Sequence, residues 1–372
     1  MIVNILFSYT IHFSMITMLC FIILLFLLPI SWTYIPPKIT VRRLSDQPII
    51  SFWSNQSQFR FNYNSAFLPL PDGSIALVVR VQDLLPNATS NYDVGPSKLA
   101  IVKQVDKSLT DYEYVHNAQI IIDSEDRPYQ IAGVEDPRIT IINGSYYLFY
   151  TAVYWTSSHE WSAHAALAIC DSGKDPTKKG NWILHPPLFP ELSWSKAATL
   201  LVHNATHQYV FFNESNIELA LAVNNDLCHY RYRNETFIHI RSDYFDSELV
   251  EPGPEPQRLS DGNYLFLYNS ARRLPLPNNH LKPNWDREYN LGWVIMDGKD
   301  PTKILARSDQ PILVPELDWE RCDLESGEWA KRGLTPRVIF AEGWKQTSTD
   351  RFLLWYQGCD AVIGLAEVII EF

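Results

Sequence analysis

A short polar turn followed by a run of aromatic and β-branched residues recurs five times along the chain. Runs of this composition, entered from a turn, are typical of β-strands in hairpins. The turns and runs are 72–73 with 76–79, 143–144 with 146–150, 204–206 with 209–212, 261–262 with 264–268, and 349–350 with 352–356. Successive units lie roughly 55 to 90 residues apart, which is longer than a solenoid repeat and fits four-stranded blades with loop insertions. The sequence therefore predicts an all-β fold, a five-bladed β-propeller, with a β-sandwich of repeated hairpins as the alternative.

The beginning of the chain carries a long apolar run. Residues 13–34 are almost all apolar and come close to the roughly 20 residues that a membrane-spanning helix needs. Because residues 31–33 lack the small-x-small pattern of a cleavage site, we expect an uncleaved signal anchor, with a cleaved signal peptide as the alternative. The predicted organisation is an N-terminal tail over 1–12, a transmembrane signal-anchor helix over 13–34, a stem over 35–50 and one propeller domain over 51–372.

Two features disagree about the side of the membrane on which the propeller lies. Lys38, Arg42 and Arg43 follow the apolar run and no Lys or Arg precedes it, which favours a cytoplasmic propeller. Asn-x-Ser/Thr sequons favour a luminal one. They occur at Asn213 and at five glycosylation candidates, Asn55, Asn87, Asn143, Asn204 and Asn234. We expect a single-pass protein with the propeller luminal (ER or Golgi) or extracellular, or secreted if the segment is cleaved, although turn preference alone explains some sequons.

The composition excludes some classes of partner. The formal net charge is -11 and Lys and Arg do not cluster, which argues against a nucleic-acid partner. Twelve Trp, 19 Tyr and 18 Phe suit β-strands and also stacking on sugar rings. The four cysteines outside the apolar run could pair in an oxidising compartment, but they lack the CxxC spacing of a zinc site. They are Cys170, Cys228, Cys322 and Cys359. We therefore expect no metal and no organic cofactor.

The segment most informative for chemistry is 133–138, Gly-Val-Glu-Asp-Pro-Arg, at the entrance of the predicted strand 139–142. Successive side chains of a strand point to opposite faces, so we expect only one of Glu135 and Asp136 to face a central site. Partial burial there would raise the pKa of that acid, as a general acid requires, and Arg138 could orient it or bind a ligand oxygen. A buried Glu–Arg pair that closes a blade is the alternative.

This segment, with the strand Asn143 to Ala152, resembles the signature of glycoside hydrolase family 130, the mannoside phosphorylases and related β-mannosidases. Further segments agree with that family in the same order along the chain. They are 63–66 with 77–80, 253–256 with 267–269, 291–293 with 297–301, 311–316, and 355–360 with 364–366. The resemblance covers nearly everything after residue 50.

The resemblance implies a five-bladed propeller with an axial pocket that cleaves β-mannosides, in a mannose-containing oligosaccharide or glycan, with inversion. The Asp of the family motif is the general acid, and it corresponds to Asp136. In the family's phosphorylases this proton is thought to pass through a hydroxyl of the mannosyl unit while phosphate attacks from the opposite face. The substrate-binding residues expected here are Asn64, Arg80, Glu135, Arg138, Tyr154, Tyr268, Asn269 and Asp360.

The sequence departs from the phosphorylase pattern at three positions. Those enzymes carry a Lys, a His and an Arg where this chain has Leu249 or a neighbour, Asn269 and Asn213. A phosphate dianion beside a carboxylate needs cations and donors, so we expect phosphate binding to be severely weakened. Two acids lie in the same neighbourhoods, and an inverting hydrolase needs a carboxylate base about 6.5 to 9.5 Å from its acid. Glu251 is the first candidate for this base and Glu214 the second, with solvated loop acids as the alternative.

Three hypotheses follow. The first is an inverting β-mannoside hydrolase with Asp136 as acid and Glu251 or Glu214 as base. The second is a β-mannoside phosphorylase, or a mannosyltransferase running in reverse from mannose 1-phosphate, with inorganic phosphate as co-substrate. The third is a non-catalytic glycan-binding propeller. The insertion 271–286 could form a basic lip over the pocket through Arg272, Arg273 and Lys282, which keeps phosphate binding open.

Overall fold

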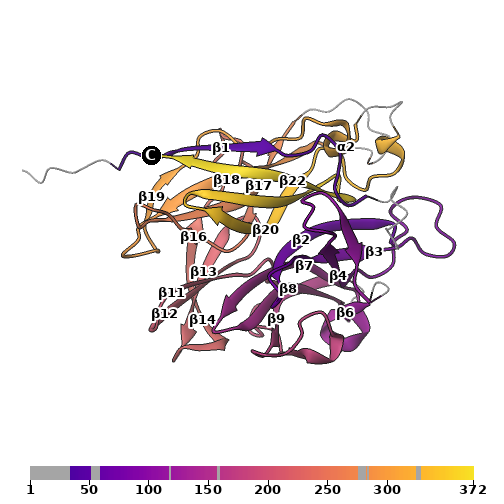
Figure 1. Ribbon diagram of the computed structural model, residues 1–372, viewed down its shortest axis with the longest axis horizontal. Coiled ribbons are helices and arrows are strands. Elements are labelled where there is room, and N and C mark those ends of the chain that lie inside the picture. The colour runs from indigo at the N-terminus through magenta and orange to yellow at the C-terminus, as the bar shows by residue number, and fades with distance from the viewer. Residues whose placement is uncertain are drawn as a thin grey trace, which may run out of the picture. The chain divides into compact units, whose positions relative to one another are not determined.

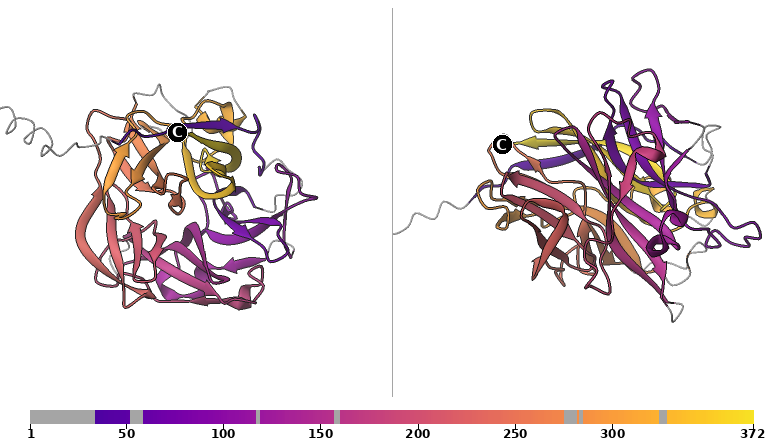
Figure 2. Two further views of the ribbon diagram at one scale, coloured as in Figure 1. Left: turned by 60° about the vertical axis from the view of Figure 1, so that its left-hand side comes forward. Right: turned by 90° about the horizontal axis from the view of Figure 1, so that it is seen from below.

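Five antiparallel β-sheets arranged around a centre make up the structured part of the chain (Figure 1; Figure 2, left). The computed structural model describes residues 34–51, 59–116, 119–156, 160–274, 282, 285–323 and 328–372. Each sheet uses consecutive strands of the chain, except that one strand of the last sheet comes from the beginning. The predicted five-bladed β-propeller is confirmed.

The blades are numbered in chain order by their strands. Blade 1 contains β2 (Phe61–Pro69), β3 (Ile75–Gln82), β4 (Lys98–Gln104), β5 (Tyr112–Tyr114) and β6 (Ile120–Ile122). Blade 2 contains β7 (Gly133–Ile142), β8 (Ser145–Trp155), β9 (Trp161–Cys170) and β10 (Trp182–Leu184). Blade 3 contains β11 (Thr199–Asn204), β12 (His207–Phe212), β13 (Ile217–Val223) and β14 (Asp226–Ile238).

Blades 4 and 5 complete the ring. Blade 4 contains β15 (Leu249–Pro252), β16 (Gln257–Arg258), β17 (Tyr264–Arg273), β18 (Arg287–Met296) and β19 (Ile304–Arg307). Blade 5 contains β20 (Ile339–Ser348), β21 (Arg351–Gly358), β22 (Val362–Glu371) and β1 (Lys38–Arg43). Helical structure is confined to the short α2 (Asp318–Arg321) and to 3-10 turns at Ser124–Asp126, Pro128–Gln130, Lys179–Asn181 and Trp329–Lys331 within the described residues.

The five repeated turn-and-run units are the first hairpins of the five blades. In blade 2, for example, β7 ends at Ile142, the turn holds Asn143 and Gly144 at positive φ, and Ser145 pairs back with Ile142. The run that follows each turn becomes the second strand of its blade and is buried between neighbouring sheets. Apolar clusters of this kind lie between blades 1 and 2, 2 and 3, 3 and 4, and 5 and 1. A strand covered on both faces explains why these runs are continuously apolar rather than alternating.

The ring is closed by the first strand of the described chain. β1 runs antiparallel to the last strand, β22, from the pair Lys38–Glu371 to the pair Arg43–Ala366 (Figure 1). Arg43 also binds Glu320 at the end of α2 with two nitrogens, at 2.7 and 2.8 Å. The stem predicted over 35–50 therefore needs correction, because residues 38–43 belong to blade 5. The cations that suggested a cytoplasmic propeller are sheet residues with carboxylate partners in that blade or in α2.

The predicted tail over 1–12 and signal anchor over 13–34 lie outside the described residues, apart from Tyr34. In the described part of the chain, no helix is long and apolar enough to cross a membrane. Among the glycosylation candidates, Asn55 also lies outside the described residues, while Asn87, Asn143, Asn204 and Asn234 are exposed. Membrane attachment, a luminal or extracellular location and glycosylation therefore stay predictions.

One disulfide, Cys322–Cys359, joins the segment after α2 to the end of β21. Cys170 and Cys228 are free. The backbone N–H groups of Leu334 and Thr335 both donate to the carbonyl oxygen of Cys359, at 3.0 and 3.1 Å. The disulfide thus fixes the loop before β20, and that loop forms part of the wall of the cavity described next.

Candidate active site

A cavity of about 600 Å³ opens at the end of the ring where the innermost strands of the blades begin. Every blade contributes to its wall. Asn64 and Arg80 come from blade 1, Glu135 and Asp136 from blade 2, Lys196 and Glu214 from blade 3, Glu251 and Tyr289 from blade 4, and Gln357 and Asp360 from blade 5. Side chains that are far apart in the sequence thereby face one another around an axial pocket, which the resemblance described above implies.

Glu135 and Asp136 both face this cavity, which corrects the expectation that only one of them would. A β-bulge in β7 is the cause: Glu135 pairs with Thr151 and Arg138 with Phe149, so one residue of β8 opposes two of β7. Asp136 has φ 54, in the left-handed region, which redirects its side chain. Arg80 then binds both acids, Glu135 through Nη2 at 2.5 Å and Asp136 through Nη1 at 2.8 Å.

The two acids have opposite pKa shifts. Burial favours the neutral form of Asp136, but the nearby Arg80, Lys196 and Arg138 outweigh burial and hold the pKa of Asp136 below its ordinary value. The expectation of a raised pKa for Asp136 is therefore wrong. Burial raises the pKa of Glu135, only partly opposed by Arg80. Asp136 is thus the more acidic member of the pair.

Lys196 is the main site residue that the sequence did not reveal. Its Nζ lies 3.8 Å from Asp136, 3.5 Å from Glu214 and 3.8 Å from Glu251. It precedes β11 in a loop held by two hydrogen bonds. Asn213 N donates to the Lys196 carbonyl at 2.7 Å, and Ala197 N donates to Thr151 Oγ1 at 3.1 Å. Strand periodicity carries no information about such a loop residue, and a single Lys between Ser195 and Ala197 gives no motif.

Glu251 lies deeper in the cavity than Glu214. The Glu251 side chain is 2% exposed and that of Glu214 27%. Burial raises the pKa of Glu251 to about 7, against the opposing effect of Lys196 and Arg138. Asp136 and Glu251 each place one carboxylate oxygen 3.8 Å from Lys196 Nζ, so these two oxygens lie no more than twice 3.8 Å apart. This upper limit falls within the range of about 6.5 to 9.5 Å between the two carboxyl groups of inverting enzymes.

Replacement of Glu251 by Gln is expected to change the pH dependence of stability. The pKa of this acid is near 4.5 when unfolded and about 7 when folded, so its contribution to stability is full below pH 4.5 and is lost as the pH rises through 7. At about 1.4 kcal/mol per pKa unit, the free energy of unfolding of Glu251→Gln should gain about 2 to 3 kcal/mol relative to the parent between pH 4.5 and pH 8. Denaturant unfolding at both pH values measures this difference. If the difference in the free energy of unfolding between Glu251→Gln and the parent were the same at both pH values, folded Glu251 would not hold a proton at pH values where unfolded Glu251 has lost it.

Asn64 completes the surroundings of Asp136. It lies at a β-bulge of β2 with φ 45, and its Nδ2 donates to Asp136 Oδ1 at 2.6 Å and to Glu342 Oε1 at 3.0 Å. Glu342 in β20 was not predicted. The signal that could have found it is a single acid inside the otherwise apolar segment Ile339–Trp344.

Four predicted substrate-binding residues do not line this cavity. Arg138 is 1% exposed and donates to the carbonyl oxygens of Asp136, Pro252 and Gly253, so it joins blades 2 and 4 beneath the site. Asn269 is fully buried and bonds the backbone of Pro252 and Ala341.

The other two are tyrosines with different partners. Tyr268 is buried and donates to Asp246 at 2.8 Å. Tyr154 stacks on His164, with ring centroids 5.0 Å apart. Because their partners are backbone groups or side chains outside the cavity wall, Asn269, Tyr268 and Tyr154 are structural residues here. Arg138 does not line the cavity either, but its Nη2 lies 3.6 Å from the cavity acid Glu251.

Asp360 lines the cavity as predicted, and Gln357 Nε2 donates to it at 2.6 Å. Of the predicted basic lip, Lys282 lines the cavity and lies 4.1 Å from the ring of Trp285. Arg272 and Arg273 instead bind the acids Glu288, Glu248 and Asp286. One rim tryptophan, Trp161, is 57% exposed and offers a ring to a sugar that extends out of the cavity.

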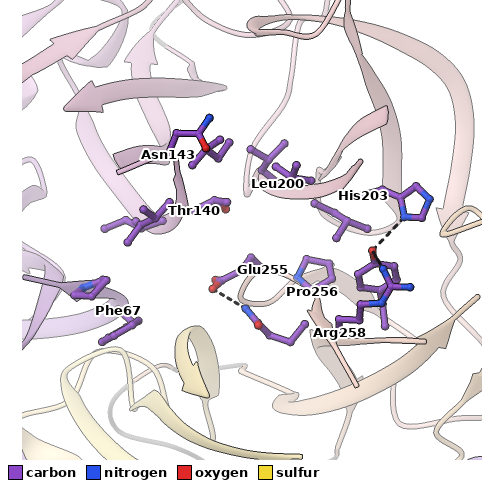
Figure 3. A pocket seen from close by; sticks show the side chains of 16 residues that line it. Phe67, Thr140, Asn143, Leu200, His203, Glu255, Pro256 and Arg258 are labelled. Carbon is purple, nitrogen blue, oxygen red and sulfur yellow. Dashed lines mark hydrogen bonds between the residues drawn. The ribbon is translucent and has the colours of Figure 1, made fainter. Parts of the chain in front are cut away.

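A second cavity of about 610 Å³ lies at the other ends of the innermost strands (Figure 3). Along β7, Glu135 and Asp136 line the first cavity, 139–142 line the second, and Arg138 lies between them. Glu255 projects into this second space and accepts a hydrogen bond from Gln257 at 3.0 Å, and burial raises its pKa to about 8. The second cavity offers one acid, Glu255, and one arginine, Arg258, among mostly apolar walls, whereas the first brings several acids together with Arg80 and Lys196. We therefore place the chemistry in the first cavity.

Neither cavity contains a metal site in the described residues, where no three His, Cys, Asp or Glu side chains gather in a way that could hold an ion. The first cavity instead offers two kinds of group. Asp136 and Glu251 can carry or accept a proton, and Arg80 and Lys196 can stabilise negative charge. These are the groups that acid-assisted displacement at a glycosidic carbon requires.

Comparisons with known proteins agree with this chemistry. The family model for glycoside hydrolase family 130, described as β-1,4-mannooligosaccharide phosphorylase, matches residues 99–372. The 1,2-β-oligomannan phosphorylase of Thermoanaerobacter sp. (strain X514) is 27% identical over 339 residues, which cover 88% of this chain and 97% of the relative. The β-1,2-mannobiose phosphorylase of the same strain is 31% identical over 241 residues, 65% of this chain and 68% of the relative.

Solved structures share the fold. One belongs to work on members of family 130 that are glycoside hydrolases targeting β-1,2-mannosidic linkages in Candida mannan. It has a TM-score of 0.66 at 21% identity and covers 91% of this chain and 94% of that chain. At 21% identity this likeness shows that the propeller fold is shared, and it shows the fold alone.

Proposed function

Because the chain belongs to glycoside hydrolase family 130, we propose that it is a β-mannoside phosphorylase that transfers the mannosyl unit to inorganic phosphate with inversion. The bond from the anomeric carbon to the glycosidic oxygen breaks, and a bond from that carbon to a phosphate oxygen forms. Asp136 supplies the proton for the leaving oxygen, directly or through a sugar hydroxyl. Hydrogen phosphate brings one proton, which returns to Asp136, so the products are α-mannose 1-phosphate and the shortened mannoside.

The observation that supports this proposal most is the position of Lys196. Its ammonium lies 3.8 Å from the proposed acid and faces the cavity, where it can attract a phosphate dianion. A dianion bound there would also offset the effect of Lys196 on Asp136 and raise the pKa of that acid, which Arg80, Lys196 and Arg138 hold down. Phosphate binding would thereby prepare Asp136 to hold a proton.

The linkage that we propose is β-1,2. Both curated relatives act on β-1,2-linked substrates by name, whereas the family model is described for β-1,4-linked ones. The relatives carry more weight here, because the first of them aligns over 97% of its own length. The oligomannan relative and the exposed Trp161 at the rim favour substrates longer than a disaccharide.

Hydrolysis is the second candidate, and Glu251 is the observation that favours it. A buried carboxylate with a pKa of about 7, which shares Lys196 with Asp136, is suited to take a proton from water near neutral pH. Glu214, 3.5 Å from Lys196, is the alternative base. In this mechanism Lys196 holds the two carboxylates in place and no phosphate is needed.

Incubation of the protein with β-1,2- and β-1,4-mannobiose and longer oligomers, with and without phosphate, tests the proposal. We expect strict dependence on phosphate and α-mannose 1-phosphate as the product, with β-1,2-linked oligomers cleaved best. Free mannose released at the same rate without phosphate would overturn phosphorolysis. The variant Glu251→Gln separates the candidates further, since it removes the base of hydrolysis and leaves the acid of phosphorolysis. Sugar binding with no cleavage under either condition would indicate a glycan-binding propeller.

A further inference from the structure

Glu342 is a buried acid next to the site that the proposed reaction does not use. It lies at a β-bulge of β20, between Ala341, which pairs with Tyr356, and Gly343, which pairs with Trp355. The Glu342 side chain is 0% exposed. Gly343 allows β20 to approach β2 closely, because a Cβ at this position would lie 2.5 Å from Phe67 N and 2.6 Å from Ser65 O. This approach brings the Glu342 carboxyl group to Asn64.

The contacts of Glu342 form a chain that leads to Asp136. Its Oε1 accepts a hydrogen bond from Asn64 Nδ2 at 3.0 Å, and the same amide nitrogen donates to Asp136 Oδ1 at 2.6 Å. Arg138 Nη2 lies 3.5 Å from Glu342 Oε1, and three N–H groups of this guanidinium donate to backbone carbonyl groups. Glu342 Oε2 is buried and has no hydrogen-bond partner in the described part of the chain. A buried carboxylate with an unsatisfied oxygen is costly unless it carries a proton.

The charges around Asp136 lead to the same conclusion. The ion pairs around Asp136 link five acids to three cations: Glu135, Asp136, Glu214, Glu251 and Glu342 to Arg80, Arg138 and Lys196. Burial raises the pKa of Glu342 well above its ordinary value, Arg138 opposes this, and Asp136 and Glu251 add repulsion. Glu342 is the least exposed acid of the group, so its negative charge is the least stabilised by solvent. A proton on Glu342 therefore relieves the most unfavourable charge of the group.

We propose that Glu342 is a positioning residue that stays protonated and holds Asn64 against Asp136. Asn64 keeps Asp136 in its orientation toward the substrate, and the neutral Glu342 provides an acceptor without adding a negative charge to a site that receives phosphate. Glu342 acts through Asn64 and touches no substrate. The inference rests on the proposed role of Asp136 as proton donor.

Two variants of similar shape test this inference. Glu342→Gln keeps a neutral acceptor for Asn64, and Glu342→Met keeps the volume without the acceptor. For whichever cleavage the parent performs, we expect kcat of Glu342→Gln to stay within about threefold and its pH profile to be unshifted. Glu342→Met should lose about tenfold or more in kcat with little change in KM, because a misplaced acid costs transition-state stabilisation.

Each alternative has a distinct result. If Glu342 were ionised, Glu342→Gln would remove a negative charge beside Asp136 and shift the pH profile to lower pH by about one unit. Equal kcat for the parent and Glu342→Met would overturn the positioning role. Asn64→Gly, which suits φ 45, should reproduce the loss in kcat, and adding Glu342→Met to it should cost nothing further. If Glu342→Met folds poorly, the pH profile of Glu342→Gln and the kcat of Asn64→Gly decide the question without it: a shifted profile or an Asn64→Gly kcat equal to that of the parent would overturn the proposal. Activity without phosphate in the parent would change the proposed function and leave these comparisons intact.

Discussion

Asp136→Asn is expected to lower kcat/KM for mannoside cleavage by about 10² to 10⁴, the usual contribution of general acid catalysis. An amide cannot donate the proton that the leaving oxygen needs. The fold should survive, because Asn tolerates the left-handed conformation that Asp136 adopts at φ 54. Release of α-mannose 1-phosphate, or of mannose, measures the effect, and circular dichroism checks the fold.

Glu135→Gln is the matched control for this variant. It changes the neighbouring acid, which shares Arg80 with Asp136, by the same substitution of an amide for a carboxyl group. We expect a loss of about tenfold at most, since only the positioning of Arg80 is disturbed. The Asp136→Asn variant should still bind the oligosaccharide, so calorimetry with the uncleaved substrate is informative. An Asp136→Asn protein that is as active as the parent would remove Asp136 from the role of acid.

Lys196→Met is expected to have the second largest effect. Removing the ammonium that faces Asp136, Glu214 and Glu251 should lower kcat/KM for phosphate by about 10² to 10³, as loss of a charge-assisted contact in a desolvated site does. The pKa of Asp136 should rise at the same time, because Lys196 helps to hold it down. A phosphate titration at fixed mannoside concentration, repeated across pH, measures both effects.

An exposed lysine provides the control for Lys196. Lys303 forms a surface ion pair with Asp300 at 3.2 Å, so Lys303→Met removes the same charge from the chain without touching the cavity. Its KM for phosphate should equal that of the parent. If Lys196→Met also leaves the KM for phosphate unchanged, phosphate does not bind beside this lysine and hydrolysis becomes the better account of the site.

The architecture could be predicted from the sequence because the blade hairpins are local. A turn such as Asp261–Gly262 and the run that follows it lie within ten residues, and their composition reports directly on strand and turn. β1 was missed for the opposite reason. Its partner β22 lies at the other end of the chain, and a short segment beside several prolines resembles a stem when that partner is out of view.

The candidate site could be predicted only where a motif marks it. Asp136 stands in a distinctive segment, and Arg80 and Asp360 lie in matched segments and do reach the cavity. Arg138 and Asn269 lie in matched segments too, but the rotation of their side chains into the protein is set by packing between blades. Sequence position therefore identified neighbours of the site without distinguishing the residues that face it.

Two errors have a common origin in backbone geometry. The strict alternation assumed for Glu135 and Asp136 fails at a bulge, and a second bulge in β20 presents Glu342. Lys196 depends on a loop conformation fixed by hydrogen bonds to residues in two blades. Bulges and loops of this kind are set by contacts distant in sequence, which a single chain read linearly does not display.

The pairing of β1 with β22 sets an order for biosynthesis. β1 is the first of the described strands to leave the ribosome and its partner β22 is the last of them, so Lys38–Arg43 must wait unpaired until Val362–Glu371 has emerged. Blades 1 to 4 can form their sheets before that point, while blade 5 cannot be completed without β22. The nascent ring therefore stays open between blades 5 and 1 until this late strand reaches the early one.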